Sequence, residues 1–367
     1  MLRSLGQAVK RIKKGIFEIQ SKDFKCLNLP AEIVNKFRAS IMFVGPMLAR
    51  CGRVGFPHPG GCVIGAGPRP IDLFLAGFKK FGAKIKALEN YYLLSAKKLK
   101  GTVFFFSRMS VTGTESLMMT ACLAEGETIL KNCAMEPEVK ALAEFLNLCG
   151  AKIEGAGTPT IKIKGVKKLK GAECYIIPDR IEAGTFAIMG ALLNTEIIIK
   201  NCYPQHLEAL WVLFDQIGVN YQLGENYIKI SPSRKKILAV DMTTHEYPGF
   251  PTDLQSPYTV LMTQCHGSSL IHETIYDRRL LFTDILVQMG ANIVMCDPHR
   301  IVVTGPTKLY GRKVISPDLR AGIAILLAAL KAEGKTEIDN IYQIDRGYEK
   351  IEERLKALRA SIKRLES

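Results

Sequence analysis

A short pattern that recurs along the chain constrains its fold more than any other feature of the sequence. Each clear copy places a glycine and a following residue, usually small, after an apolar segment and before another apolar residue. Clear copies lie at 81–85, 149–153, 217–221 and 289–293, and weaker ones at 5–7 and 358–362. The period of roughly 70 residues is longer than that of solenoid repeats, so each copy marks a small subdomain.

Every repeat unit has the same predicted order of elements, and the unit at 114–163 is the clearest. A helix rich in Ala, Leu and Met (114–124) precedes a β-branched strand (128–130), and a second amphipathic helix (138–148) ends at Gly150. A hairpin of alternating residues (160–163) closes the unit. We expect the glycine to end the helix in a left-handed conformation, which other residues adopt only at a cost.

The repeat predicts an α/β protein of six units. Five units look complete, whereas the N-terminal one has only its closing helix end and hairpin, at residues 1–19. We therefore expect a chain shortened at its N-terminus, with Met1 as an internal start or a truncated product.

Composition places the chain among ordinary two-domain globular proteins. Of its 367 residues, 47% are hydrophobic and 23% charged. The longest apolar run, 323–330, is too short to cross a bilayer, and residues 1–14 do not form a secretory signal. Ten cysteines without a C-x-x-C pair argue against a zinc site and a disulfide framework. We expect a cytoplasmic monomer without a membrane partner.

The formal charge of +15 favours anionic partners. Short lysine clusters such as 97–100 and 167–170 supply much of it, and such clusters are usually solvated turns. No basic motif with interleaved aromatic residues supports a nucleic-acid role. We predict no metal, since no ligands cluster convincingly among His206, His245, His266 and His272. We also expect no cofactor.

Six motifs together narrow the interpretation: 37–41 (FRASI), 59–65 (PGGCVIG), 69–72 (RPID), 178–185 (PDRIEAGT), 248–253 (PGFPTD) and 344–348 (IDRGY). With the repeat, they resemble the enolpyruvyl transferases, and in particular the UDP-N-acetylglucosamine 1-carboxyvinyltransferase family, along the whole chain. The resemblance implies a two-domain, inside-out α/β barrel. We place the domains at 1–178, with the Cys62 loop, and 179–367, with Asp253 and Arg346, and the active site in the cleft between them.

Cys62 stands apart from the other cysteines, because it lies in a segment rich in Gly and Pro (57–70), which is typical of a surface loop. The resemblance makes Cys62 the acid that protonates C3 of phosphoenolpyruvate. A thiol with an ordinary pKa of about 8.5 suits that role, and Arg69 nearby would lower the pKa and make the sulfur nucleophilic. The family's alkylation by the epoxide antibiotic fosfomycin fits this chemistry.

The remaining site assignments also follow from the resemblance. Phosphoenolpyruvate and a UDP-sugar are both anionic, and Arg suits bidentate contact with phosphate and carboxylate. We assign Arg69 and Arg346 to phosphoenolpyruvate, with Arg346 counted as catalytic. The full set of expected substrate-binding residues is Arg38, Arg69, Pro70, Ile71, Asp72, Leu73, Arg108, Met109, Ser110, Val111, Ile275, Arg279, Asp318 and Arg320.

Two aspartates have simpler structural interpretations beside the catalytic ones. Asp253 follows a Pro-rich turn and begins a helix, so it could be a plain N-cap. The resemblance implies instead that it accepts or orients the proton of the sugar 3-hydroxyl. Asp318 precedes a helix and could cap it while also lying at the active site. Residues 108–111 precede a helix expected near Thr114, whose N-terminal N–H groups suit an anion or a uracil carbonyl.

The resemblance predicts transfer of enolpyruvyl from phosphoenolpyruvate to the 3-hydroxyl of UDP-N-acetylglucosamine, in peptidoglycan precursor synthesis. Two alternatives remain. Family members carry a phosphoenolpyruvate-contacting Lys-Asn pair in the segment that this chain lacks, so the chain could be an inactive remnant that binds the UDP-sugar at most. The sister enzyme, 3-phosphoshikimate 1-carboxyvinyltransferase, is disfavoured by the cysteine loop and the FPTD motif.

Overall fold

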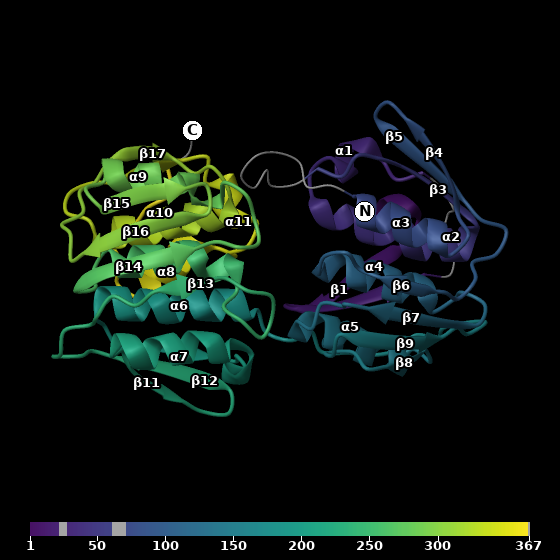
Figure 1. The fold of residues 1–367 in the computed structure, drawn as a ribbon, viewed down its shortest axis with the longest axis horizontal. Coiled ribbons are helices and arrows are strands. Elements are labelled where there is room, and N and C mark those ends of the chain that lie inside the picture. The colour runs from purple at the N-terminus through teal and green to yellow at the C-terminus, as the bar shows by residue number, and fades with distance from the viewer. Residues whose placement is uncertain (22–27, 61–70, 366–367) are drawn as a thin grey trace. The chain divides into compact units, whose positions relative to one another are not determined.

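The computed structural model describes residues 1–21, 28–60 and 71–365, which fall into two compact units. Unit 1 extends to Ile177 and unit 2 begins at Pro178. Each unit has its own hydrophobic core, and in each the helices lie inside and short sheets cover them (Figure 1). Each unit is therefore described by itself.

Three sheets belong to unit 1. Their strand orders are β1-β2, β3-β5-β4 and β6-β7-β9-β8, with β6 and β7 parallel and the other pairs antiparallel. The strands are β1 (Ala8–Lys13), β2 (Ile16–Gln20), β3 (Arg53–Pro57), β4 (Lys84–Leu88), β5 (Tyr91–Ser95), β6 (Val103–Phe105), β7 (Glu127–Lys131), β8 (Lys152–Glu154) and β9 (Thr160–Lys164). The helices are η1 (Arg3–Leu5), α1 (Ala31–Val34), η2 (Arg38–Phe43), α2 (Val44–Cys51), α3 (Asp72–Lys80), α4 (Val111–Ala121) and α5 (Pro137–Leu148).

Unit 2 repeats this plan, with strand orders β10-β12-β11, β13-β14-β16-β15 and β17-β18. The strands are β10 (Ile197–Lys200), β11 (Asn220–Leu223), β12 (Tyr227–Ser231), β13 (Met242–Thr243), β14 (Gly267–His272), β15 (Asn292–Asp297), β16 (Arg300–Gly305), β17 (Lys313–Ile315) and β18 (Glu337–Asp339). The helices are α6 (Arg180–Leu193), η3 (Pro204–Leu207), α7 (Glu208–Ile217), α8 (Thr252–Met262), η4 (Arg279–Phe282), α9 (Thr283–Gln288), α10 (Leu319–Lys331), α11 (Tyr342–Asp345) and α12 (Ile351–Ala357).

The glycine pattern behaves as the sequence predicts. Gly82, Gly150, Gly218 and Gly290 all have positive φ, between 85° and 105°, and each leads from a helix into a strand. The N-terminal copy is also confirmed, since Gly6 (φ 83°) ends η1 and the β1-β2 hairpin follows. In the C-terminal copy Arg359 takes the glycine's place with φ 68°, a conformation that disfavours a side chain.

Two expectations about the units are wrong. The helix expected at 114–124 is α4, which runs from Val111 to Ala121, because Ser110 caps it three residues earlier than expected. The C-terminal unit is incomplete, because no strand follows the 358–362 copy up to residue 365, where the described chain stops. Within the described residues, its sheet consists of β17 and β18.

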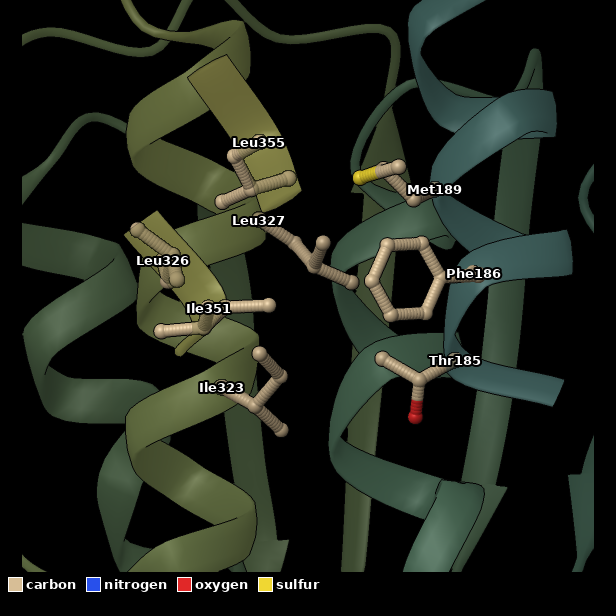
Figure 2. Close-up of a pocket in the computed structure, with 8 residues that line it drawn as sticks. All are labelled: Thr185, Phe186, Met189, Ile323, Leu326, Leu327, Ile351 and Leu355. Carbon is tan, nitrogen blue, oxygen red and sulfur yellow. The ribbon is translucent and has the colours of Figure 1, made fainter. Parts of the chain in front are cut away.

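The core of unit 2 is built on α6, α8 and α10, which contact one another. All three helices are buried over most of their length, as expected for helices that are apolar on nearly every side. Beside α6 and α10 lies a small cavity of ≈ 10 Å³, completed by α12 (Figure 2). Its lining is apolar apart from Thr185, and its size makes it a packing defect rather than a ligand site. The lining residues are Thr185, Phe186, Met189, Ile323, Leu326, Leu327, Ile351 and Leu355.

No helix in the part of the chain that the structure describes is long and apolar enough to cross a membrane.

Candidate functional site

The side chain of Asp253 is the centre of the best-defined polar cluster in unit 2. It projects from the first turn of α8, where Arg279 Nη2 donates to Oδ1 at 2.8 Å and Arg320 Nη2 donates to Oδ2 at 2.8 Å. The Arg279 side chain is only 4% exposed and that of Arg320 18%, whereas the Asp253 side chain is 35% exposed. The carboxylate is therefore clamped by two largely buried guanidinium groups and still reaches the surface of the unit.

The simpler interpretation of Asp253 as an N-cap is wrong. The N-cap position of α8 is Pro251, which makes no side-chain capping hydrogen bond, and both oxygens of Asp253 accept from arginine instead. Proline before the helix fixes an extended backbone conformation there, with φ −71° and ψ 130°. This starts the helix without a capping side chain and leaves the aspartate available for the arginines.

The electrostatics of this cluster keep Asp253 ionised. Burial opposes the charge, but Arg320 and Arg279 outweigh burial through their charges and hydrogen bonds, so the pKa of Asp253 lies below its ordinary value. The same pairing holds the pKa of Arg320 above its ordinary value, although burial alone would lower it. A carboxylate in this state accepts hydrogen bonds at neutral pH and is a weak base.

Arg320 is presented by the N-terminus of α10. Asp318 caps that helix, because its Oδ1 accepts from the N–H groups of Arg320 (2.8 Å) and Ala321 (3.0 Å). The capping interpretation of Asp318 is thus confirmed, and the cap fixes the backbone from which Arg320 reaches Asp253.

Burial raises the pKa of Tyr348, whose hydroxyl lies 2.9 Å from Thr185 Oγ1.

A second layer of the cluster involves residues that the sequence did not single out. Thr252 Oγ1 accepts from Arg279 Nη1 (2.8 Å) and donates to Glu273 Oε2 (2.8 Å). Glu273 is completely buried, and its Oε1 accepts from the N–H groups of Ile275 (2.9 Å) and Tyr276 (3.1 Å). Thr252 stands beside Asp253 in the sequence and could have been suspected, but no local pattern marks a glutamate at the end of a strand as a buried acceptor.

Arg346 is presented by a different segment of unit 2. It follows α11 directly, and its Nη1 donates to Gln343 Oε1 at 3.2 Å. The catalytic assignment of Arg346 stays a prediction.

In unit 1, the expected residues form a smaller polar group between α3 and α4. Arg108 Nη2 donates to Asp72 Oδ1 at 3.1 Å, and Asp72 is the first residue of α3. Ser110 caps α4 by accepting from the Gly113 N–H at 3.1 Å, and Val111 is the first residue of that helix. This arrangement brings a cation and a capped helix N-terminus close to the same carboxylate.

The other assignments in unit 1 stay predictions. Ile71 and Leu73 are buried, at 4% and 7% exposure, so their side chains belong to the core. Arg38 opens η2, and Met109 precedes the cap of α4. Cys62, Arg69 and Pro70 lie outside the described residues.

Among the residues that the structure describes, no group of three or more His, Cys, Asp and Glu side chains is placed to hold a metal ion.

Comparisons with known proteins cover nearly the whole chain. The sequence profile described as "EPSP synthase (3-phosphoshikimate 1-carboxyvinyltransferase)" matches residues 1–355. A protein of Koribacter versatilis named UDP-N-acetylglucosamine 1-carboxyvinyltransferase is 49% identical over 91% of this chain and 76% of its own length. A protein of the same name from Desulforapulum autotrophicum is 42% identical over 100% and 87%.

Solved structures show the same fold at low sequence identity. The enolpyruvyl transferase NikO from Streptomyces tendae has a TM-score of 0.90 at 23% identity, over 99% of this chain and 86% of its own. EPSP synthase from Acinetobacter baumannii has a TM-score of 0.70 at 18% identity, over 98% and 85%. These two structures establish the fold alone.

Proposed function

The chain belongs to the EPSP synthase family and, within it, to the UDP-N-acetylglucosamine 1-carboxyvinyltransferases, and from this we propose that it transfers the enolpyruvyl group of phosphoenolpyruvate to the 3-hydroxyl of UDP-N-acetylglucosamine. The observation that carries the proposal is 40–49% identity to proteins of that name over nearly the entire chain. The product is a precursor of peptidoglycan. We propose that the protein acts as a cytoplasmic monomer.

The Asp253 cluster supports this function in unit 2. Formation of the C2–O bond requires the sugar 3-hydroxyl to lose its proton, and an ionised carboxylate with fixed oxygens can orient that hydroxyl and accept the proton. The guanidinium groups on both oxygens make Asp253 a weak base, so it accepts the proton only as the new bond forms. Asp253 is thereby assigned the catalytic proton transfer, with Arg279 and Arg320 holding its geometry.

The other half of the reaction needs an acid and an anion site. We assign the acid to Cys62, which gives its proton to C3 of phosphoenolpyruvate while C2 accepts the sugar oxygen. The C–O bond to phosphate then breaks and phosphate leaves, C3 gives a proton back to the Cys62 thiolate, and the double bond returns. Arg69 and Arg346 are assigned to the phosphate and carboxylate, since guanidinium groups suit both.

Contacts to the sugar nucleotide are proposed for residues of both units. Arg38, residues 69–73 and the Arg108–Val111 segment belong to unit 1, whereas Ile275, Arg279 and Asp318 belong to unit 2. Because Glu273 already accepts from the Ile275 N–H, a backbone contact from Ile275 would come from its carbonyl oxygen. Ile71 and Leu73 are buried and can likewise offer only backbone groups.

The test is phosphate release from phosphoenolpyruvate by the purified chain with three acceptors: UDP-N-acetylglucosamine, shikimate 3-phosphate or none. We expect release with the UDP-sugar alone. Release with shikimate 3-phosphate would support the activity of 3-phosphoshikimate 1-carboxyvinyltransferase, the enzyme after which the matching family is named. Binding of the UDP-sugar without release would identify an inactive remnant.

Alkylation by fosfomycin tests the acid separately. We expect a covalent adduct, detected by mass spectrometry of the intact chain, that disappears in Cys62→Ser. The matched control is Cys174→Ser, which removes an exposed cysteine and should leave labelling intact. Labelling that persists in Cys62→Ser would refute the assignment.

A further inference from the structure

The carboxylate of Glu273 is buried without a direct cationic partner. It has no solvent exposure, and no Lys, Arg or His side chain forms an ion pair with it within the described ranges. Buried carboxylates are usually paired or saturated with hydrogen bonds, because an isolated buried charge is costly. Here three donors serve it: one hydroxyl and two backbone N–H groups.

The hydroxyl is the link to the functional site. Thr252 Oγ1 donates its single proton to Glu273 Oε2, so its lone pairs are left to accept from Arg279 Nη1. The other terminal nitrogen of Arg279 donates to Asp253. The result is a continuous chain of hydrogen bonds from Glu273 through Thr252 and Arg279 to Asp253, with each step at 2.8 Å.

The same glutamate also fixes the segment that carries Arg279. Its Oε1 binds the N–H groups of Ile275 and Tyr276, and its backbone carbonyl lies 2.9 Å from His299 Nδ1. The Tyr276 ring in turn lies 5.1 Å from Arg279 Cζ, within cation–π range. Glu273 thus holds the backbone of residues 275 and 276 directly. Through the Tyr276 ring and the Thr252 hydroxyl it also reaches the side chain of Arg279.

We propose that Glu273 and Thr252 are positioning residues for the transfer reaction: they fix Arg279 in the orientation that aims and tunes the Asp253 carboxylate. The inference rests on the proposed function. Neither residue needs to touch a substrate. The hydrogen-bonded link from Glu273 to Arg279 passes through the Thr252 hydroxyl, which can be removed without changing the size of the side chain.

The experiment compares Thr252→Val with Thr252→Ser. Valine keeps the shape and removes the hydroxyl, and losing a hydrogen bond to a charged group corresponds to about a 10- to 100-fold effect. We expect kcat to fall by that factor, with KM for phosphoenolpyruvate within about twofold of wild type. The acid limb of the kcat/KM profile should move to higher pH, because a loosened Arg279 stabilises ionised Asp253 less. Serine should restore most of the lost turnover and the original acid limb.

Thr259→Val is the matched control, because Thr259 is a completely buried residue of the same helix and, among the described residues, its hydroxyl is hydrogen-bonded to Gln255 instead. It should lower thermal stability without moving the acid limb. If Thr252→Val does not fold, Thr252→Ala removes the same hydroxyl, and Glu273→Gln tests the next link. An acid limb and kcat unchanged in Thr252→Val, in an otherwise active protein, would overturn the inference. A wild-type protein that releases no phosphate would overturn the proposed function instead.

Discussion

Helices α4 and α8 occupy the same place in two repeat units, yet each carries a carboxyl group whose pKa is shifted in the opposite direction. Each helix has eleven residues and precedes the second strand of a four-stranded sheet, β7 in unit 1 and β14 in unit 2. Burial and the neighbouring Glu138 and Glu136 raise the pKa of Glu115 on α4 to about 7. The pKa of Asp253 on α8 is lowered, because Arg320 and Arg279 outweigh its burial.

Net charge alone would predict the reverse: a lowered carboxyl pKa in unit 1 and not in unit 2. Residues 1–177 contain 28 Lys and Arg against 13 Asp and Glu, whereas residues 178–367 contain 22 of each. The whole excess of +15 thus falls in the region that holds the carboxylate with the raised pKa. Exposed lysines are screened by water and salt, and buried partners at hydrogen-bond distance are screened far less. The nearest few groups therefore decide the state of a carboxylate, and the charge of the domain does not.

The largest effect should come from removing the charge at Asp253. Asp253→Asn leaves one arginine facing an amide N–H₂ instead of an oxygen, and it removes the proposed proton acceptor. General-base catalysis contributes about 10²- to 10⁴-fold, so we expect kcat to fall by that order. Steady-state phosphate release with UDP-N-acetylglucosamine measures it.

Asp284→Asn is the control for that substitution. Asp284 is an exposed aspartate in the first turn of α9, in the same unit. It should retain wild-type turnover. A loss of less than about tenfold in Asp253→Asn would show that the carboxylate orients the substrate at most, and the contrast with Glu115 would lose its functional meaning.

The repeat made much of this comparison predictable. Glycine positions at helix ends and the period of the apolar residues follow from local conformational preferences, so the helices and hairpins could be placed from the sequence. The cap at Asp318 was also predictable, because an aspartate before a helix has few better partners than the first N–H groups.

The contacts that set the chemistry could not be predicted in the same way. Asp253 has the same sequence signature as a cap, and only tertiary packing brings Arg320 from 67 residues away to its carboxylate. Glu273 gave no local signal at all, since its partners depend on how the strand end meets α8. Residues that act through distant neighbours are thus the ones that sequence patterns miss.

A smaller effect should appear at Glu115 and depend on pH. The folded pKa of about 7 exceeds the unfolded value of about 4.3, so between these values the folded state holds a proton that the unfolded state has released. Stability therefore falls as pH rises from about 4 to 7 and stays reduced above. Glu115→Gln should be about 2 kcal/mol more stable than wild type at about pH 8 and equal to it near pH 4. The difference is smaller than the full pKa shift implies, because the partial exposure of Glu115 reduces the free-energy cost of its charge.

Urea unfolding at several pH values measures this difference. Glu127→Gln, at an exposed position on β7, is the matched control and should show no such pH dependence. A Glu115→Gln variant whose advantage does not change with pH would mean that packing, and not ionisation, separates the two proteins. Of the two opposite pKa shifts on α4 and α8, only that of Asp253 would then remain supported.

The smallest effect should come from the aspartate–arginine pair of unit 1. Asp72 and Arg108 are 65% and 55% exposed, in contrast to the clamp around Asp253. Exposed pairs contribute about 0.2–1 kcal/mol, so Asp72→Asn should lower the free energy of unfolding by about 0.5 kcal/mol, and by less at about 0.5 M salt. Urea unfolding at low and high salt checks this, with Glu144→Gln on α5 as a second exposed pair for comparison. A loss above about 2 kcal/mol would contradict the rule that burial separates the two aspartates, because a solvated pair would then stabilise the fold as strongly as a buried one.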